Sequence, residues 1–372
     1  MLIYLLNPFH AGSHQVWAEG YQRNSQHEVQ IYSLRGKYWK WRMQGGAIAL
    51  AEKVMDQGQT PDLVLGTDML DLCTFQALTR KRLARVPMVL YFHENQLTIP
   101  WSPDDPDLAE QRDRHYAFIN YRSALAADAL WFNSHYHRSS FHQALPTFLR
   151  AFPDCRGLNT LTELQAKSHC LPVGLNFPTN HNRHSLRESD KPPLILWNHR
   201  WEQDKNPELF FRTLIKLAEA GLDFRLAVLG ESYARSPAIF AEVQGRLAAQ
   251  LVRRGFLEKR ADYWDWLRRA HVLPVTAHHD FFGLSVVEAI AAGVWPLLPR
   301  RLAYPEHLPV ASDVHWYDSE EEFESKLRSF LINPAKPDPK LAEQVRNYHW
   351  DKVAPQYDQA AEQLVESRLD SS

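Results

Sequence analysis

Short, mainly apolar runs alternate with longer segments of helical composition through the first half of the chain. The runs that predict buried strands are Leu2–Leu6, Glu28–Leu34, Asp62–Gly66, Pro87–Phe92 and Ala129–Phe132. The expected helices are Ser13–Asn24, Ala47–Asp56, Leu72–Arg85, Arg112–Ala127 and His135–Leu145. Buried strands that alternate with helices form mostly parallel sheets covered on both faces, and this predicts an α/β fold. Such sheets bind ligands at the carboxyl ends of their strands, so the loops after Leu6, Gly66, Phe92 and Phe132 are the informative ones.

The alternation resumes at Leu194–Trp197. Further expected strands are Phe224–Leu229, Gly255–Leu257 and His271–Thr276, and the expected helices are Pro207–Ala220, Ala238–Arg254 and Asp262–Arg269. Because 372 residues exceed one typical core, we expect two domains. A stretch rich in proline, asparagine, histidine and charge separates them and reads as a hinge. We predict a first domain over 1–176, a linker over 177–193, a second domain over 194–339 and a C-terminal helical segment over 340–372.

Charge and cysteine content exclude several classes of protein. The formal net charge of −2 means that a nucleic-acid partner must use a local basic patch rather than the field of the whole chain. The three cysteines, Cys73, Cys155 and Cys170, form no CxxC pair, which indicates a reducing compartment and argues against a zinc site. The first apolar run lacks a basic segment before it, and no run reaches the ~18 residues of a membrane span. We therefore expect a cytoplasmic protein.

Two acids lie on a strand-to-helix loop in the stretch from Thr276 to Pro299. Asp280 precedes an expected helix over 284–292, and Glu288 lies just over one turn inside it. The amides from Gly283 to Ser285 begin that helix, where unpaired N–H groups and the helix dipole favour phosphate. The acids and the amides could therefore surround one anionic ligand. An ordinary strand-to-helix unit with two surface acids is the alternative.

Two cations follow the strand Leu194–Trp197. Arg200 and Lys205 lie in the loop before the helix that starts at Pro207. A guanidinium can contact a phosphate through two parallel hydrogen bonds, and an ammonium supplies a compact point charge. The loop therefore predicts a second set of contacts to a phosphate, with two solvated surface cations as the alternative.

Polar groups also follow strands of the first half. Gly12, after the first strand, would let a backbone approach a ligand, and Ser13 is expected to cap the next helix. His93, Glu94, Asn95 and Gln96 follow directly on the strand that ends at Phe92, which favours a binding site over a structural histidine. No G-x-G-x-x-G motif is present, so a nicotinamide site is not expected. The acids Asp104, Asp105 and Asp107 could hold a metal ion, but a solvated loop is favoured.

Basic and aromatic residues interleave from Lys37 to Arg42. Lys37, Trp39, Trp41 and Arg42 are placed between the second expected strand and the next expected helix. Such a segment suits a surface where rings stack on bases and cations meet phosphates. Two tryptophans packed under the sheet, with the cations outside, are the alternative.

The second-half motif resembles the donor-site signature of retaining glycosyltransferases with the GT-B fold. It reads Asp280, then Phe282-Gly283-Leu284, then Glu288-Ala289-Ile290-Ala291-Ala292-Gly293, and departs from the signature only in having Asp280 where glutamate is usual. The resemblance implies two Rossmann-like domains facing a deep cleft. It further implies that Arg200 and Lys205 hold the donor diphosphate, that Glu288 meets the ribose and that Asp280 meets the donor sugar. The residues that the resemblance adds to the donor site are Gly12, Ser13, Phe282, Gly283, Leu284 and Ser285, with His93 facing the donor from the first domain.

The first-half motifs narrow the resemblance to the tRNA-queuosine mannosyltransferase family. They are Phe9-x-x-Gly12-Ser13-His14, Lys37-x-Trp39-x-Trp41-Arg42, Tyr91-x-His93-Glu94-Asn95-Gln96-Leu97 with Pro100, and Phe132-Asn133-Ser134 with Ser140-Phe141. This resemblance implies transfer of mannose from GDP-mannose to the cyclopentene-diol of queuosine in the anticodon of tRNA for aspartate, without a metal or other cofactor. The implied acceptor residues are His14, Lys37, Trp39, Trp41, Arg42, Glu94, Asn95 and Gln96. A related transferase acting on a lipid or polysaccharide, and a non-catalytic tRNA-binding protein, remain alternatives.

Overall fold

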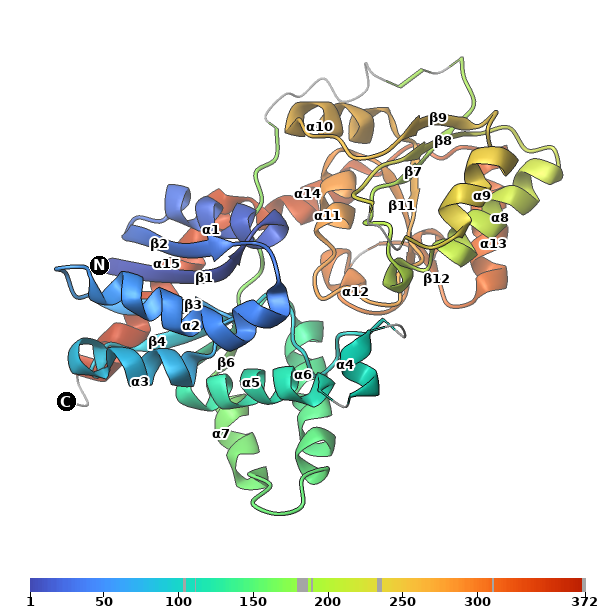
Figure 1. Cartoon of the computed structure of the whole chain (residues 1–372). Helices are drawn as coiled ribbons and strands as arrows, with labels where there is room; N and C mark the ends of the chain where they lie inside the picture. Colours follow the sequence, from blue (N-terminus) through green and yellow to red (C-terminus); the bar gives the residue numbers. More distant parts are fainter. Residues whose placement is uncertain are drawn as a thin grey trace. The chain divides into compact units, whose positions relative to one another are not determined.

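The computed structural model describes residues 1–102, 105–110, 112–178, 187–188, 190–232, 236–309 and 311–369. It divides the chain into two compact units (Figure 1). The first comprises Met1–Asn176 and Tyr348–Ser372, and the second comprises Phe177–Asn347. That the two units face one another across a cleft stays a prediction.

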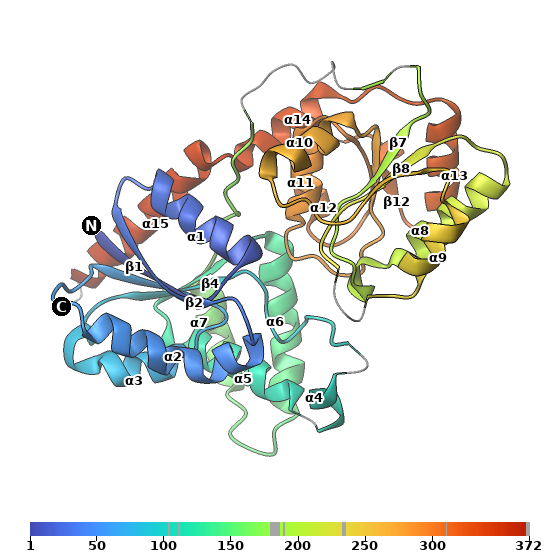
Figure 2. The ribbon, with the colours of Figure 1, turned by 45° about the horizontal axis from the view of Figure 1, so that its top comes forward.

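A six-stranded parallel sheet forms the centre of the first unit, in the order β2-β1-β3-β4-β5-β6. Its strands are β1 (Leu2–His10), β2 (Glu28–Arg35), β3 (Leu63–Thr67), β4 (Met88–Phe92), β5 (Ala129–Phe132) and β6 (Ser168–Cys170). The helices are α1 (Gly12–Asn24), α2 (Trp39–Met55), α3 (Leu72–Leu83), α4 (Pro106–Ala109), α5 (Asp113–Ala126), α6 (His135–Arg150), α7 (Leu161–Ala166) and α15 (Trp350–Leu369). Figure 2 shows α1 and α15 on one face of the sheet and α2, α3 and α5 on the other. The predicted parallel α/β sheet is confirmed.

Two helices of the first unit begin earlier than the sequence predicts. α2 starts at Trp39, so the interleaved motif from Trp39 to Arg42 forms its first turn and only Lys37 and Tyr38 precede the helix. The prediction was wrong because Gly45 and Gly46 are poor helix formers; in the structure, a Cβ on Gly46 would come within 3.1 Å of Pro8, so the gap between helix and strand requires glycine there. α1 starts at Gly12 with Ala11 as its N-cap, and Ser13 therefore caps nothing.

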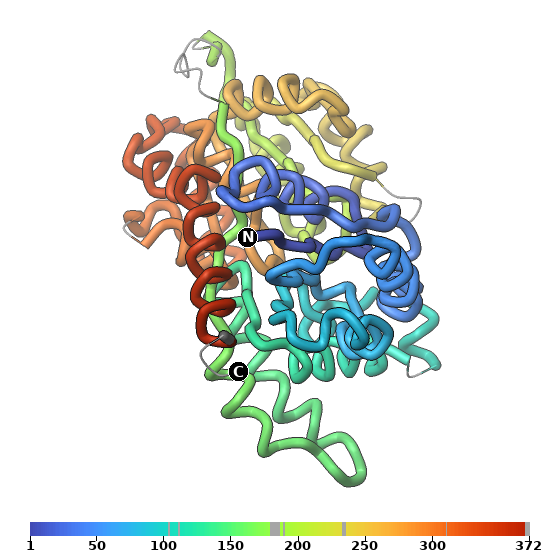
Figure 3. The backbone as a smooth tube through the Cα atoms, turned by 90° about the vertical axis from the view of Figure 1, so that its left-hand side faces the viewer, coloured from blue at the N-terminus to red at the C-terminus, as the bar shows by residue number. Residues whose placement is uncertain are grey.

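The C-terminal helix α15 belongs to the first unit, along which it runs in Figure 3. Its first residue, Trp350, is fully buried and occupies the space left by two glycines, since a Cβ on either Gly20 or Gly174 would lie 2.3 Å from its indole. Further along, the buried carboxylate of Asp358 accepts hydrogen bonds from the Tyr21 hydroxyl at 2.9 Å and the Ser25 hydroxyl at 2.6 Å. Burial and hydrogen bonding together attach the helix to α1.

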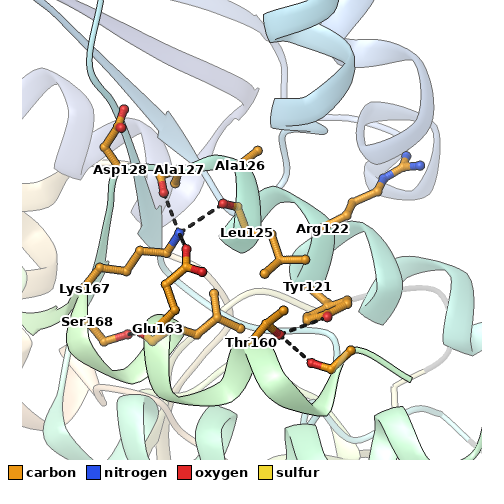
Figure 4. Close-up of polar contacts among 12 residues, drawn as sticks. Tyr121, Arg122, Leu125, Ala126, Ala127, Asp128, Thr160, Glu163, Lys167 and Ser168 are labelled. Atoms are coloured by element: carbon orange, nitrogen blue, oxygen red, sulfur yellow. Dashed lines mark hydrogen bonds and ion pairs between the residues drawn. The ribbon is translucent and has the colours of Figure 1, made fainter. Parts of the chain in front are cut away.

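Lysine 167 ties the end of α5 to the segment that leads into β6. Its ammonium donates to the carbonyl oxygens of Leu125 at 3.0 Å and Ala127 at 2.7 Å, and lies 3.2 Å from the Glu163 carboxylate (Figure 4). A cation at a helix C-terminus satisfies carbonyls that have no partner within the helix. The contact holds the last strand of the sheet in place.

The second unit contains a parallel sheet of the same size, in the order β12-β11-β10-β7-β8-β9. Its strands are β7 (Leu194–Trp197), β8 (Arg225–Val228), β9 (Leu251–Arg254), β10 (Val272–Pro274), β11 (Trp295–Pro299) and β12 (Trp316–Tyr317). The helices are α8 (Pro207–Glu219), α9 (Ile239–Arg246), α10 (Arg260–Arg269), α11 (Leu284–Ala291), α12 (Tyr304–His307), α13 (Glu320–Ile332) and α14 (Pro339–Val345). Its core is an aromatic and aliphatic cluster that includes Trp197, Phe210 and Phe211.

One predicted helix of the second unit is wrong. The segment expected to be helical through Arg254 ends at Arg246, and its last residues form the edge strand β9 instead of the expected strand over 255–257. The helix-favouring composition of the segment hides the change, because β9 is short and none of its four residues is fully buried. Within the described ranges, no helix is both long and apolar enough to cross a membrane.

Candidate active site

Lysine 205 is the centre of the polar cluster at the carboxyl ends of β7 and β10. Its ammonium lies 2.8 Å from Asp204 Oδ2 and 3.0 Å from Asp280 Oδ1, and it donates to the carbonyl oxygen of His279 at 2.6 Å. The Lys205 side chain is only 8% exposed. An ammonium has three N–H donors, and all three are directed at these acceptors. For Lys205 to contact a diphosphate directly, one of these bonds must give way.

Asp280 is held on both oxygens. Its Oδ2 accepts a hydrogen bond of 2.6 Å from the hydroxyl of the buried Tyr304. Burial alone would raise the pKa of this carboxyl, but the opposing charge of Lys205 and the other hydrogen-bonding neighbours bring the pKa down to about 2. Gly283 has a positive φ of 79°, and a Cβ there would lie 2.9 Å from the Tyr304 ring. Glycine is therefore required where the loop turns into α11.

Polar side chains after β7 connect this cluster to the first turn of α11. Asn198 Nδ2 donates to the Ser285 carbonyl at 2.8 Å, and His199 Nδ1 lies 3.1 Å from the Ser285 hydroxyl. Burial lowers the pKa of His199 to about 4, so its ring is neutral at physiological pH. In the described part of the chain, Asn198 Oδ1, His199 Nε2 and His279 Nε2 are enclosed without a hydrogen-bond partner. Buried polar atoms are rarely left in that state, which indicates a missing ligand or water.

Glu288 is buried near the first turns of α11, as the sequence predicts, but it is already engaged. Its Oε2 accepts a hydrogen bond of 3.0 Å from the Tyr263 hydroxyl, and its Oε1 pairs with Arg260. Both partners come from α10, which the sequence did not suggest as part of the site. The lone pairs that remain on the two oxygens are the ones a ribose could use.

Arg200 differs from Lys205 in its surroundings. Its side chain is 55% exposed and lies 3.0 Å from Glu202 in the same loop. An exposed guanidinium of this kind can move to a ligand at small cost, since surface ion pairs contribute about 0–1 kcal/mol. The structure therefore brings Lys205, Asp280, Gly283, Leu284, Ser285 and Glu288 together, with Arg200 at the exposed border of the same loops and Phe282 buried behind them.

A second polar cluster lies at the carboxyl ends of β3 and β4 in the first unit. The His93 ring packs against His14, with ring centroids 4.2 Å apart, and edge-on against Trp17 at 4.6 Å. Burial, followed by the neighbouring His14 and His137, holds the pKa of His93 well below its usual value, so this ring is neutral. His14 and His93, which follow β1 and β4, therefore lie in contact, a pairing that the sequence did not predict.

Asp68, which was not among the predicted site residues, belongs to this cluster. The fully buried carboxyl accepts a hydrogen bond of 2.9 Å from the His93 amide, and burial together with the nearby Glu94 raises its pKa well above the usual value. Five side-chain atoms of this cluster are enclosed with no partner among the described residues: Thr67 Oγ1, Asp68 Oδ2, His93 Nε2, Asn95 Nδ2 and Gln96 Oε1. The signal was available, because Asp68 is the first charged residue after a buried strand.

The remaining predicted acceptor residues are divided between the surface and the interior. Trp39 packs against Trp101 and Tyr116 in a small apolar cluster, whereas Trp41 is exposed to 62%. Lys37 lies just before α2 and is exposed, whereas Arg42 is half-buried on the first turn of α2. Gly12 and Ser13 are exposed at the start of α1. Of the two tryptophans predicted to stack on bases, only Trp41 is therefore available at the surface.

The acids considered for a metal ion have another role. Asp105 and Asp107 both pair with Lys40, at 2.5 and 2.6 Å, while Asp104 lies outside the described residues. Across the ranges that the structure describes, no group of three or more His, Cys, Asp or Glu side chains is placed to hold a metal ion. That the protein needs neither metal nor other cofactor stays a prediction.

Comparison with solved structures identifies the fold class. Sucrose-phosphate synthase from Thermosynechococcus elongatus superposes with a TM-score of 0.70 at 14% identity and covers 99% of this chain and 100% of its own. The catalytic domain of starch synthase IV from Arabidopsis thaliana, bound to ADP and acarbose, superposes with a TM-score of 0.69 at 11% identity and covers 98% and 99%. The family model "Glycosyl transferases group 1" matches residues 178–349. The chain is a glycosyltransferase of the GT-B fold.

Sequence relatives narrow the class to a family. A model described as "tRNA-queuosine alpha-mannosyltransferase N-terminal" matches residues 2–175. The tRNA-queuosine alpha-mannosyltransferase of Drosophila melanogaster is 31% identical over 99% of this chain and 95% of its own length. The chain belongs to the tRNA-queuosine alpha-mannosyltransferase family. A more distant relative is a GDP-mannose-dependent alpha-(1-6)-phosphatidylinositol dimannoside mannosyltransferase from Mycobacterium tuberculosis, 25% identical over 45% of this chain and 44% of its own.

Proposed function

We propose that the protein transfers mannose from GDP-mannose to the cyclopentene-diol of queuosine in the anticodon of tRNA for aspartate. The observation that carries the proposal is the similarity to the Drosophila enzyme, which extends over both units. The name of the mycobacterial relative supports GDP-mannose as the donor. An enzyme with a tRNA acceptor acts where tRNA is found, and we therefore expect it in the cytoplasm.

The donor roles follow from the charge that develops as the glycosidic bond breaks. The leaving diphosphate gains negative charge, which Arg200 and the first amides of α11 would stabilise. Asp280, held ionised, would accept hydrogen bonds from the sugar hydroxyls, and Glu288 would accept them from the ribose. Lys205 orders Asp280 in the free enzyme and reaches the diphosphate only by exchanging one of its contacts.

The acceptor roles follow from the cluster around Asp68 and His93. A vicinal diol both donates and accepts hydrogen bonds, and the enclosed Asp68 Oδ2, His93 Nε2 and Asn95 Nδ2 supply groups of both kinds. We propose that the transfer retains the anomeric configuration and that the leaving phosphate takes the proton of the attacking hydroxyl. Closure of the enzyme around both substrates would limit hydrolysis of the donor.

The test is a panel of donors and acceptors. The protein is incubated with GDP-mannose or a UDP-sugar and with tRNA that contains or lacks queuosine, and the digested nucleosides are weighed by mass spectrometry. A hexose increment on queuosine with GDP-mannose alone is expected. A hexose increment with a UDP-sugar instead would show that the donor is that UDP-sugar and not GDP-mannose. Because the mycobacterial relative is named for a phosphatidylinositol mannoside, that lipid is included, and its glycosylation in place of queuosine would replace the acceptor.

A further inference from the structure

A basic groove lies beside the edge of the first unit's sheet. β2 is the outermost strand there, and α2 packs over its carboxyl end. A pocket of about 430 Å³ opens between them, lined by His10, Ser33, Leu34, Arg35, Arg42 and Lys53. Four of these six lining residues are basic types and none is acidic. A concave surface lined by cations attracts anions.

The fold arranges these side chains along one direction. His10 and Arg35 are paired in register near the ends of β1 and β2. Arg42 and Lys53 lie eleven positions apart on α2, which is three turns or about 16 Å along one face. Arg42 Nε donates to the Arg35 carbonyl at 3.1 Å, and Lys53 Nζ donates to the Ser33 carbonyl at 2.8 Å. These two carbonyls lie two residues apart on β2, so the two cationic groups meet the strand about 7 Å apart.

Most of the basic residues of the groove have no ion-pair partner among the described residues. None of the ion pairs in the described part of the structure involves Arg35, Arg42 or Lys53. By contrast, Lys40, on the same helix, is paired with two acids. His10 approaches one acid, Glu19, at 3.5 Å. Cations gathered without counter-charges repel one another, and a bound polyanion removes that repulsion.

Aromatic rings lie beside the groove on the first turn of α2. Trp41 is 62% exposed and Tyr38 is 76% exposed, although large aromatic rings usually bury most of their surface. The indole of Trp41 covers Gly45, where a Cβ would lie 2.9 Å from the ring. Tyr38 has a left-handed backbone with φ of 57°, which costs about 1–3 kcal/mol for a residue of this kind. An exposed indole supported on glycine is a flat surface for stacking.

We infer that this groove holds the phosphodiester backbone of the RNA acceptor and that an unpaired base beside it stacks on Trp41. The inference rests on the proposed function and names the contacts by which the first unit would bind its RNA. Proteins bind single-stranded nucleic acid with a cationic groove that follows the backbone and aromatic rings that stack on the bases. The inference adds His10, Arg35 and Lys53 to the predicted acceptor residues. It also assigns Arg42 to the phosphate contacts and Trp41 to the stacked base.

The test compares two double variants that remove equal charge. The groove variant, Arg35→Gln with Lys53→Gln, removes two of the cations that line the groove. The matched control, Arg80→Gln with Lys81→Gln, removes two exposed cations from α3. Binding of the queuosine-containing tRNA is measured from 50 to 200 mM salt. Each lost phosphate contact should reduce the slope of log K against log salt by about 0.7–0.9, so the groove variant should lose about 1.4–1.8 and the control nothing. Trp41→Ala should weaken RNA binding about 5- to 150-fold.

Steady-state kinetics separate RNA binding from donor binding. The groove variant should raise KM for tRNA and leave KM for the nucleotide sugar unchanged. If the wild-type protein transfers mannose to queuosine and the groove variant keeps the salt slope of the control, the groove is refuted while the function stands. If the wild type transfers nothing but the groove variant loses RNA binding, the function is refuted while the groove stands.

Binding of AMP and of inorganic phosphate distinguishes a polynucleotide from a smaller phosphate ligand. A loss of AMP binding in the groove variant without a loss of tRNA affinity would assign the groove to a mononucleotide and overturn the inference. All of the substituted side chains are exposed, so both double variants should melt at the wild-type temperature. The melting curves check that any change in the salt slope comes from lost contacts and not from lost structure.

Discussion

Substitution of Lys205 by methionine should strongly lower the free energy of unfolding of the second unit. Methionine keeps the length of the side chain but removes the ammonium that lies 2.8 Å from Asp204 and 3.0 Å from Asp280. Two carboxylates, each 16% exposed, then face one another without a cation. Removing one partner of a buried ion pair costs about 3–5 kcal/mol because the remaining charge is uncompensated.

Differential scanning calorimetry provides the assay, since a chain with two units need not unfold in one step. A loss of 3–5 kcal/mol lowers the melting temperature of a unit of this size by about 6–20 °C. Arg200→Met is the matched control, because its guanidinium is 55% exposed and a surface pair contributes about 0–1 kcal/mol. GDP binding, measured by calorimetry, should weaken in both variants if both cations serve the diphosphate.

A second-site change tests the cause of the loss. Adding Asp280→Asn to Lys205→Met removes one of the two facing charges and should recover part of the stability, with a coupling of about 0.5–3 kcal/mol. Donor binding should not recover, because Asp280 is itself proposed to meet the sugar. If Lys205→Met and Arg200→Met melt at the same temperature, Lys205 is not engaged by these carboxylates and our description of the site is wrong.

Three further predictions concern stability and pH. Asp68→Asn should raise the free energy of unfolding at pH 8 by about 0.5–2 kcal/mol and lower the rate of transfer. The reason is that the folded state raises the pKa of this carboxyl, so that ionising it in the folded protein is unfavourable. The gain in stability should vanish at acidic pH, and an equal gain at both pH values would refute the reasoning. Asp358→Ala should cost about 1.5–3 kcal/mol and expose α15 to proteolysis, whereas Asp351→Ala, 79% exposed, should have little effect. The buried rings of His199, His279 and His307 have pKa values lowered to about 4, so the unfolded chain takes up protons near pH 6.5 before the folded chain does. The melting temperature should therefore fall from pH 7.5 to pH 5, and an unchanged value would contradict the neutral state of these rings.

Local sequence signals predicted those elements whose limits are set by short-range chemistry. β5 and β7 have the predicted bounds because each is an apolar run that ends at polar or small residues. The start of α2 was wrong because Gly46 packs against Pro8 of β1, a tertiary contact that composition does not reveal. The strand β9 was missed because it lies at the edge of the sheet, where half-buried residues alternate with exposed ones.

The sequence predicted which loops form the site but not which side chains contact one another within it. Asp280 and Glu288 were identified from a local motif, yet their partners are distant in sequence: Lys205 lies 75 residues from Asp280, and Arg260 lies 28 residues from Glu288. Which side chains pair with a given carboxylate depends on how loops from separate strands come together in the fold. A single sequence does not show this. Asp68 could have been identified from its place directly after the buried strand β3, but its raised pKa depends on burial and on Glu94, which a sequence alone does not show.

A tRNA mannosyltransferase of this fold requires that a donor site in the second unit serve an RNA acceptor bound by the first. The most direct measurement follows radiolabelled mannose from GDP-mannose into queuosine-containing tRNA with the wild-type protein and with Glu288→Gln. We predict label on the queuosine nucleoside with the wild type, and its loss in Glu288→Gln with the RNA affinity preserved. Label that appears equally with both proteins, or none with the wild type, would contradict the account.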